Sequence, residues 1–369
     1  MKNPFKAVLK ASRMARKGRP VSAALILQQM LLPSVKRRRA KTAAKQVKSG
    51  TSHPRIVLAR PHRPVPGTFT DGRFGNAQGS LSYKLYTPRG SARRRMPLVV
   101  MLHGCTQSAG DFAAGTGMNA LADELGFLVL YPEQSASANF GRCWNWHRLG
   151  DQGRGGGEPA VIAALTLHAI AACRANPARV YIAGISAGGA AAAIIAAAYP
   201  ELYVAVGVHS GLARGNITTI GGALSAMRNG TGPRTVGKTT RPQPMIIFHG
   251  DQDGVVHPSN AMGFLNHLQR SGPGPLVRRS YCGQSTGGRD FTRALYRTSS
   301  GEVLLEDWTV HGSGHAWSGG TPAGSHTDPA GPDASREMVR FFLARKRAAV
   351  RETARAEATV GKIRVARRA

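Results

Sequence analysis

The stretch Arg179-Val180-Tyr181-Ile182-Ala183-Gly184-Ile185-Ser186-Ala187-Gly188-Gly189-Ala190 is the most informative in the chain. Its first half is β-branched and aromatic, which predicts a strand, and the alanine-rich run that follows, free of proline until Pro200, predicts a helix. A Gly-x-Ser-x-Gly sequence is common in glycine-rich turns. Between a strand and a helix, however, it is typical of a turn that exposes a nucleophilic serine. Ser186 is therefore the candidate nucleophile.

The 369-residue chain is strongly basic, with 50 Lys and Arg against 19 Asp and Glu, a formal net charge of +31 and a pI near 11.3. No acidic residue precedes Asp71, and the stretch from Arg345 onward is basic again. We expect a basic, proline-ending leader at 1–66, partly helical or disordered, then a catalytic domain at 67–347 and a basic tail at 348–369. The two ends suit contact with an anionic surface or polymer granule, or they are solvated tails without a partner. No specific nucleic-acid motif is present.

No stretch approaches the roughly 20 apolar residues of a membrane-spanning helix, so no transmembrane segment is expected. The apolar run Val21–Leu32 is interrupted by Gln28 and Gln29, and no small-residue cleavage site follows it. A secretory signal peptide is therefore not recognised in the leader.

The four cysteines are too few and too scattered for a disulfide scaffold, and no CxxC pair indicates a metal site. Three pairings among them are open. Cys105 and Cys143 both fall in segments placed near the candidate site, so a bridge between them is a hypothesis.

Buried apolar runs alternate with helical segments from residue 80 onward. Strands are predicted at 80–86, 97–103, 127–131, 204–208, 245–248, 293–297 and 303–310, and helices at 111–125, 158–173, 187–198, 258–270 and 333–347. The glycine-rich insertion 216–241 is expected to form a loop or short helices. Strands alternating with helices predict an α/β fold with a mostly parallel central sheet and helices on both faces.

A serine nucleophile needs a base within hydrogen-bond reach and an acid to orient that base. After the strand at 245–248, Asp251 and Asp253 compete for the role of acid. We favour Asp253, which lies in the turn just before a helix, and expect Asp251 to brace the loop. After the strand at 303–310, His315 lies in a glycine-flanked loop and is the expected base, whereas His311 directly ends the strand and is expected to be structural.

Acyl transfer also needs amide donors for the oxyanion. The backbone N–H of Ala187, just after the nucleophile, is one candidate. The N–H of Cys105, in the His-Gly turn after the strand at 97–103, is the second. Trp144, Trp146 and Trp317 lie near these segments and could form an apolar ledge for a polymeric substrate, although core packing is the usual role of such residues.

As a set, these segments resemble the polyhydroxyalkanoate (PHB) depolymerase family of α/β-hydrolase esterases. The matching stretches are Leu102-His103-Gly104-Cys105-Thr106-Gln107, Arg142-Cys143-Trp144-Asn145-Trp146, Gly184-Ile185-Ser186-Ala187-Gly188-Gly189, His249-Gly250-Asp251-Gln252-Asp253 and Gly314-His315-Ala316-Trp317.

The resemblance implies a serine esterase that cleaves short-chain hydroxyacid polyesters with Ser186, Asp253 and His315 as its triad, using no metal or organic cofactor. Feruloyl and acetylxylan esterases share this frame, so they are an alternative for the substrate. Members of the family are typically secreted, which implies an extracellular protein; the missing signal peptide keeps a cytoplasmic location open. A protein of another class, which binds polymer or an anionic surface on a hydrolase scaffold, is the remaining alternative.

Overall fold

The computed structural model describes residues 66–90, 94–213, 219–230, 243–271 and 274–347. The chain divides into two units, Met1–Pro66 and Gly67–Ala369, and the description concerns the second. Apart from Pro66, the expected leader lies outside the described residues, and so does the expected tail at 348–369. The anionic contacts considered for these ends therefore stay predictions.

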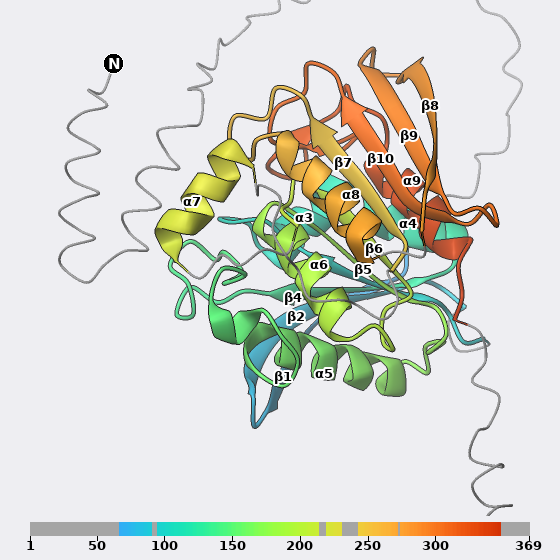
Figure 1. Cartoon of the computed structure of the whole chain (residues 1–369). Helices are drawn as coiled ribbons and strands as arrows, with labels where there is room; N and C mark the ends of the chain where they lie inside the picture. Colours follow the sequence, from blue (N-terminus) through green and yellow to red (C-terminus); the bar gives the residue numbers. More distant parts are fainter. Residues whose placement is uncertain (1–65, 91–93, 214–218, 231–242, 272–273, 348–369) are drawn as a thin grey trace, which may run out of the picture. The chain divides into compact units, whose positions relative to one another are not determined.

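Ten strands of the described residues form one sheet with the order β1-β2-β4-β3-β5-β6-β7-β10-β9-β8 (Figure 1). The strands from β4 to β10 in this order are parallel, while β1, β2, β9 and β8 pair antiparallel at the two edges. The strands are β1 (Thr68–Asn76), β2 (Gly79–Thr87), β3 (Leu98–Leu102), β4 (Leu128–Glu133), β5 (Val180–Ile185), β6 (Ala205–His209), β7 (Met245–Gly250), β8 (Val277–Gln284), β9 (Asp290–Arg297) and β10 (Val303–Val310). The predicted α/β class is confirmed.

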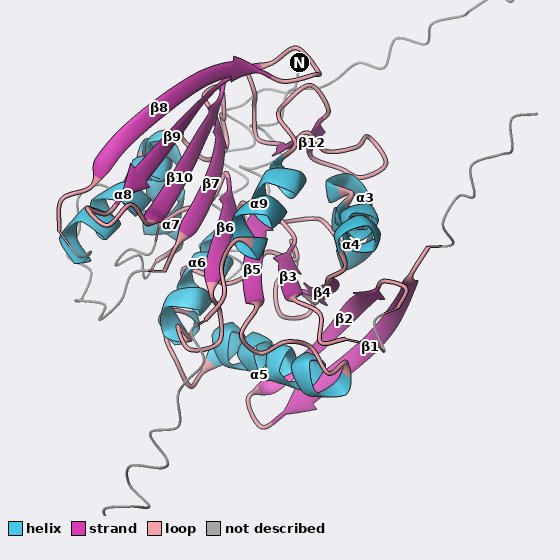
Figure 2. Ribbon diagram, turned by 90° about the vertical axis from the view of Figure 1, so that its right-hand side faces the viewer, coloured by secondary structure: helices cyan, strands magenta, loops and turns pink. Residues whose placement is uncertain are grey.

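Helices cover both faces of the sheet, and each face has its own apolar core (Figure 2). One face packs against α5 (Gly157–Ala172), α6 (Ala187–Ala198), α7 (Ile220–Asn229) and α8 (Ser259–Ser271). The other packs against α3 (Ala109–Thr116), α4 (Met118–Leu125) and α9 (Ala334–Leu343). The central strands are buried on both sides, which is why their sequences are continuous apolar runs.

The structure differs from the predicted elements in a few places. The helix predicted at 111–125 is two helices, because Gly117 takes a left-handed conformation with φ of 64° and ends α3. The last helix stops at Leu343 rather than at 347. In the insertion 216–241, α7 is a helix, and residues 216–218 and 231–241 lie outside the described part.

Parallel strands bring the predicted site segments to one edge of the sheet. The carboxyl ends of β3, β5, β7 and β10 lead directly into the segments that hold Cys105, Ser186, Asp253 and His315, respectively. The crevice outside this edge is where α/β sheets bind their ligands. A short two-stranded ribbon of β11 (Trp317–Ser318) and β12 (Thr327–Asp328) follows His315.

Candidate active site

Ser186 lies on a strained turn between β5 and α6. Its φ of 56° and ψ of −122° are rarely adopted by a residue with a side chain. Its N–H donates to the carbonyl of His209 at 2.9 Å. A Cβ on Gly184 would lie 2.5 Å from the carbonyl carbon of Gly188, and one on Gly188 would lie 2.2 Å from the carbonyl oxygen of Leu102. The glycines therefore allow the close approach of strand, turn and helix that the sequence predicts.

Asp253 is buried and pairs with His315, whose side chain is 11% exposed. The Nδ1 atom of His315 donates to Oδ2 of Asp253 at 2.7 Å, while Oδ1 accepts from the amides of Val255 and Val256 at 2.9 and 2.8 Å. Burial acts to raise the pKa of Asp253, but the hydrogen bond from His315 and the nearby histidines outweigh it and lower the pKa to about 2. This carboxylate is thus held ionised behind the imidazole.

The bond to Asp253 determines which imidazole nitrogen of His315 is available. With Nδ1 engaged, Nε2 is the remaining basic atom, and it has no hydrogen-bond partner within the described residues. A neutral imidazole protonated at Nδ1 accepts a proton at Nε2, as a general base must.

The competing pair, Asp251 and His311, has a different environment. Oδ2 of Asp251 accepts from Nδ1 of His311 at 2.9 Å, and Oδ1 accepts from the amide of Gly312 at 2.7 Å. The other ring nitrogen of His311 bonds the hydroxyl of Thr292 at 2.9 Å. Both nitrogens of His311 are therefore occupied, and both side chains are about a third or more exposed, which suits the bracing role expected for them.

Further histidines around the site are buried and neutral. Burial lowers the pKa of His209 to about 3, and its Nε2 accepts from the amide of Ser318 at 2.9 Å. Burial likewise lowers the pKa of His103, whose Nε2 accepts from the amide of Gln134 at 3.1 Å. These hydrogen bonds from backbone amides hold the neighbouring loops in place.

The amides of Cys105 and Ala187 are the two candidate oxyanion donors. Neither has a hydrogen-bond acceptor in the part of the chain that the structure describes. The turn before Cys105 is braced by Gln107, whose Oε1 accepts from the amide of Gly104 at 2.9 Å and whose Nε2 donates to Asp111 at 2.9 Å. An unpaired amide on a braced turn, and another at the start of α6, are suited to bind an oxyanion.

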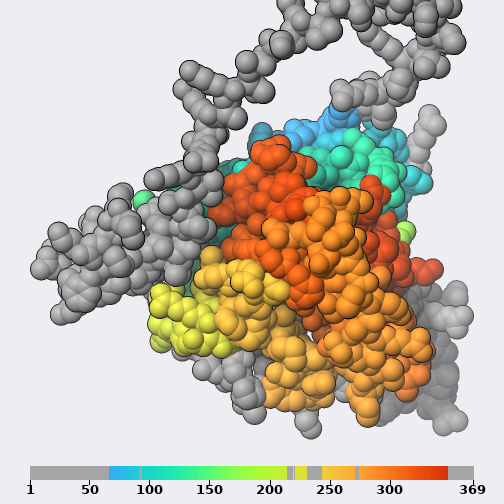
Figure 3. Space-filling view, turned by 90° about the horizontal axis from the view of Figure 1, so that it is seen from above, coloured from blue at the N-terminus to red at the C-terminus, as the bar shows by residue number. Residues whose placement is uncertain are grey.

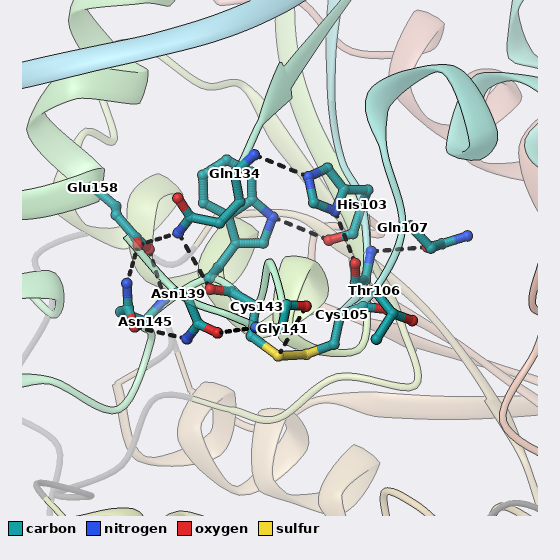
Figure 4. The surroundings of a disulfide bond; sticks show 12 residues. His103, Cys105, Thr106, Gln107, Gln134, Asn139, Gly141, Cys143, Asn145 and Glu158 are labelled. Atoms are coloured by element: carbon teal, nitrogen blue, oxygen red, sulfur yellow. Dashed lines mark hydrogen bonds between the residues drawn. A yellow bond between two sulfur atoms is a disulfide. The ribbon is translucent and has the colours of Figure 1, made fainter. Parts of the chain in front are cut away.

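Cys105 and Cys143 form a disulfide with their Cα atoms 4.2 Å apart (Figure 4). The pairing hypothesised from the sequence is confirmed, and Cys173 and Cys282 are free. The bridge joins the candidate oxyanion turn to the segment between β4 and α5.

The structure does not support the predicted apolar ledge of Trp144, Trp146 and Trp317. Trp144 and Trp317 are completely buried, and Trp146 is nearly so. The indole N–H of Trp144 donates to the carbonyl of His103 at 3.0 Å, and that of Trp317 to the hydroxyl of Ser335 at 3.0 Å. Their polar atoms are satisfied inside the core, so these rings serve as packing rather than as a surface for a polymer.

Sequence reasoning missed two polar residues beside the site, Gln134 and Glu158. Gln134 directly follows β4, and Glu158 lies in the first turn of α5, at the same edge of the sheet. This placement is the one sequence signal that could have indicated them. Glu158 accepts hydrogen bonds from Asn145 and Gln134.

No group of three or more His, Cys, Asp or Glu side chains placed to hold a metal occurs among the described residues. The same part of the chain has no helix with the length and hydropathy to cross a membrane.

Known depolymerases and esterases are similar in sequence to this chain. The chain is 31% identical over 278 residues to poly(3-hydroxyalkanoate) depolymerase C of Paucimonas lemoignei, covering 72% of this chain and 65% of the relative. It is also 31% identical over 209 residues to acetylxylan esterase A of Talaromyces purpureogenus, covering 51% of this chain and 52% of the relative. The chain thus spans about half to just under two thirds of these relatives.

Among solved structures, an acetyl xylan esterase from Aspergillus awamori aligns with a TM-score of 0.57 at 21% identity, covering 75% of this chain and 99% of that one. This similarity supports the α/β-hydrolase fold. Residues 81–272, more than half of the chain, match the family described as esterase PHB depolymerase. The chain belongs to the esterase PHB depolymerase family.

Proposed function

We propose that the protein is a serine esterase that hydrolyses short-chain polyhydroxyalkanoate esters through an acyl-enzyme. The observation that carries the proposal is the buried Asp253–His315 pair at the sheet edge where Ser186 occupies its strained turn. Strain of this kind is typical of functional sites, and an ionised carboxylate behind an imidazole stabilises the imidazolium that forms during catalysis.

In the proposed mechanism, the Oγ atom of Ser186 attacks the ester carbonyl while Nε2 of His315 takes the hydroxyl proton. Asp253 holds the imidazole tautomer and offsets the positive charge. The amides of Ala187 and Cys105 donate to the oxyanion of the tetrahedral intermediate. The intermediate then collapses, His315 gives its proton to the departing alcohol, and the acyl group stays on Ser186.

The same groups then hydrolyse the acyl-enzyme. His315 takes a proton from water as the water oxygen attacks the acyl carbonyl, and it returns this proton to Oγ when the carboxylic acid leaves. The proposed mechanism involves no metal or organic cofactor.

The substrate class rests on the relatives. A poly(3-hydroxyalkanoate) depolymerase is matched over more of this chain than the acetylxylan or feruloyl esterases, which favours the polyester. A feruloyl- or acetylxylan-type carbohydrate esterase is the alternative. We also propose export from the cell, since disulfides such as Cys105–Cys143 persist in oxidising compartments.

The test is hydrolysis of p-nitrophenyl butyrate by the wild type and by Ser186→Ala. The variant should fold normally and lose turnover by several orders of magnitude, because no other group replaces the nucleophile. Near-normal turnover would refute the serine mechanism and favour a binding protein on a hydrolase scaffold. Release of 3-hydroxybutyrate from amorphous polymer, compared with ferulate from an arabinoxylan ester and acetate from acetylated xylan, then decides the substrate.

A further inference from the structure

Glu158, in the first turn of α5, binds a cluster of N–H donors. Its Oε2 accepts from the amide of Asn145 at 2.7 Å, and its Oε1 accepts from the side-chain nitrogens of Asn145 and Gln134 at 2.6 and 2.5 Å. No Lys, Arg or His forms an ion pair with Glu158 within the described residues. The carboxylate is thus satisfied entirely by neutral donors.

Two opposing influences act on the ionisation of Glu158. Burial, and next the nearby Asp151 carboxylate, raise the pKa of Glu158 to about 7, while the hydrogen bonds from Asn145 and Gln134 act against that rise. Glu158 is half-buried, and an acid that is withdrawn from water without a cationic partner costs the fold free energy. This cost favours a role for Glu158 in holding the loop that carries Asn145.

The loop held by Glu158 is tied to the candidate oxyanion turn at several points (Figure 4). Gln134 also donates from its side chain to the carbonyl of Cys143 at 3.2 Å, and its amide donates to His103 at 3.1 Å. The amide of Thr106 donates to the carbonyl of Gly141 at 2.7 Å. The disulfide then links Cys143 to Cys105 itself.

A second chain of contacts runs from Glu158 to the same loop. Asn145 accepts from the side-chain nitrogen of Asn139 at 3.0 Å, and Asn139 accepts from the amide of Gly141 at 3.0 Å. Gly141 is the residue whose carbonyl receives the Thr106 amide. Two hydrogen-bonded routes and one covalent bond therefore connect Glu158 to the backbone on either side of the Cys105 amide.

We propose that Glu158 is a positioning residue for the oxyanion site, acting through Asn145, Gln134 and the Cys105–Cys143 disulfide on the amide of Cys105. The proposal rests on the function proposed above. An oxyanion donor contributes mainly in the transition state, so a displaced amide lowers kcat and leaves KM nearly unchanged.

The variant Glu158→Gln tests this with the least change of shape. The carboxylate accepts three N–H donors through two oxygens, whereas a glutamine offers one oxygen and turns its own NH2 toward a donor. Removing an oxyanion donor outright costs about 100- to 1,000-fold in kcat, so a displaced donor should cost about tenfold or more. Glu201→Gln, which alters an exposed glutamate paired with Arg154, is the matched control and should keep wild-type kcat.

Measurements on the full chain use p-nitrophenyl butyrate and a trifluoromethyl ketone, which forms a tetrahedral adduct with a catalytic serine. Kinetic constants are expressed per active site, from titration of the acylated enzyme. We expect Glu158→Gln to lower kcat and to raise the inhibition constant of the ketone by a similar factor, with KM within about twofold of wild type. A loss confined to the fraction of active enzyme would overturn the proposal, because that is the effect of a purely structural residue.

The route through the disulfide is tested by a double-mutant cycle. The variant Cys105→Ala/Cys143→Ala should lower kcat in the same way. When Glu158→Gln is added to it, the total fold-loss in kcat should be smaller than the product of the two separate fold-losses. Fully multiplicative losses would contradict the route. Failure of the serine mechanism is distinguished beforehand, because Ser186→Ala would then retain turnover.

Discussion

At the scale of single residues, the turn around Ser186 depends on missing side chains. Gly188 is the second residue of α6, and an added Cβ would meet the backbone oxygens of Leu102 and His103 at 2.2 and 2.5 Å. These are backbone atoms at the end of the buried strand β3, so they cannot rotate away as a flexible side chain would. The turn, the nucleophile and the oxyanion segment would all shift together.

We therefore expect Gly188→Ala to destabilise the fold by about 1–3 kcal/mol and to lower esterase turnover more than tenfold. Urea unfolding and p-nitrophenyl butyrate hydrolysis measure the two effects. Gly221→Ala, in helix α7 with open space around its Cβ position, is the control, and it should raise stability by about 0.5–1 kcal/mol. Equal behaviour of the two variants would show that the close contact at Gly188 does not constrain the turn.

Phe140 is an exposed aromatic side chain, unlike Trp144, Trp146 and Trp317. It is 72% exposed and precedes Gly141, whose carbonyl binds the amide of Thr106 beside the candidate oxyanion turn. We expect Phe140→Ser to weaken adsorption to amorphous polyhydroxybutyrate and to slow polymer hydrolysis about threefold or more, because apolar contact is lost. Turnover of soluble p-nitrophenyl butyrate should stay unchanged.

The control for Phe140 is Leu167→Ser, which removes a side chain that is 57% exposed on α5. Measuring bound enzyme after sedimentation of polymer granules separates adsorption from chemistry. Equal loss of adsorption in both variants would mean that general surface hydropathy, and not the segment at Phe140, determines binding.

Residue identity was easiest to predict where chemistry restricts it. Strand and turn order singled out Ser186, and local turn chemistry favoured Asp253 over Asp251. In the structure Asp253 contacts His315 and Asp251 contacts His311. Glu158 was missed because a single glutamate at a helix start has an ordinary explanation, a favourable interaction with the helix dipole. Only the three-dimensional contacts reveal which donors surround it.

At the scale of elements, predictability followed burial. The central strands are apolar on both faces and were recognised as runs, whereas β1 and β8 at the sheet edges are almost wholly exposed and polar, so neither was predicted. In the view of Figure 3, β8 and β9 lie at the molecular surface, coloured orange. Edge strands are defined by pairing with a neighbour, which their own sequence does not encode.

Glu306 on β10 links three elements at this end of the sheet. Its buried carboxylate accepts from Arg293 on β9 at 2.9 Å, from Arg340 on α9, and from the indole N–H of Trp308 at 2.9 Å. A buried carboxylate with two guanidinium partners is costly to disrupt, since removing it leaves charges uncompensated.

We expect Glu306→Gln to lower the free energy of unfolding by about 3 kcal/mol and to loosen the packing of α9 on the sheet. Chemical denaturation measures the loss, and hydrogen exchange of α9 amides reports the loosening. Glu124→Gln, at an exposed ion pair with Arg336, is the control and should have a much smaller effect. Similar losses from both variants would show that the Glu306 cluster contributes no more than a surface pair.

At the scale of the whole molecule, charge is distributed unevenly. Much of the net +31 comes from residues 1–66 and 348–369, where only Glu352 and Glu357 are acidic. The described residues between them include ionisable groups in the interior whose pKa values are displaced. Fold stability should therefore depend on pH through these interior groups rather than through the basic ends of the chain.

The sign follows from the direction of each shift. Burial lowers the pKa of His103, His209 and His249, so below pH 6.5 the unfolded chain binds more protons than the folded one, and stability is lost as pH falls. Burial raises the pKa of Glu158 to about 7 and of Asp307 to about 6, which opposes this loss in part. The histidine contribution is best isolated with a single substitution.

We predict that wild type loses stability relative to His209→Gln when the pH falls from 7 to 5. With a folded pKa near 3, His209 stays neutral in the folded protein, whereas it becomes protonated in the unfolded chain. This protonation stabilises the unfolded chain by about 1.4 kcal/mol for each pH unit below 6.5. The difference in unfolding free energy should therefore shift by roughly 2 kcal/mol. Urea unfolding at both pH values measures it, and glutamine keeps an acceptor for the Ser318 amide. A difference that stays constant between pH 7 and 5 would mean that His209 is protonated in the folded protein, and that the interior beside the candidate triad is more polar than its packing against Trp317 and Phe248 implies.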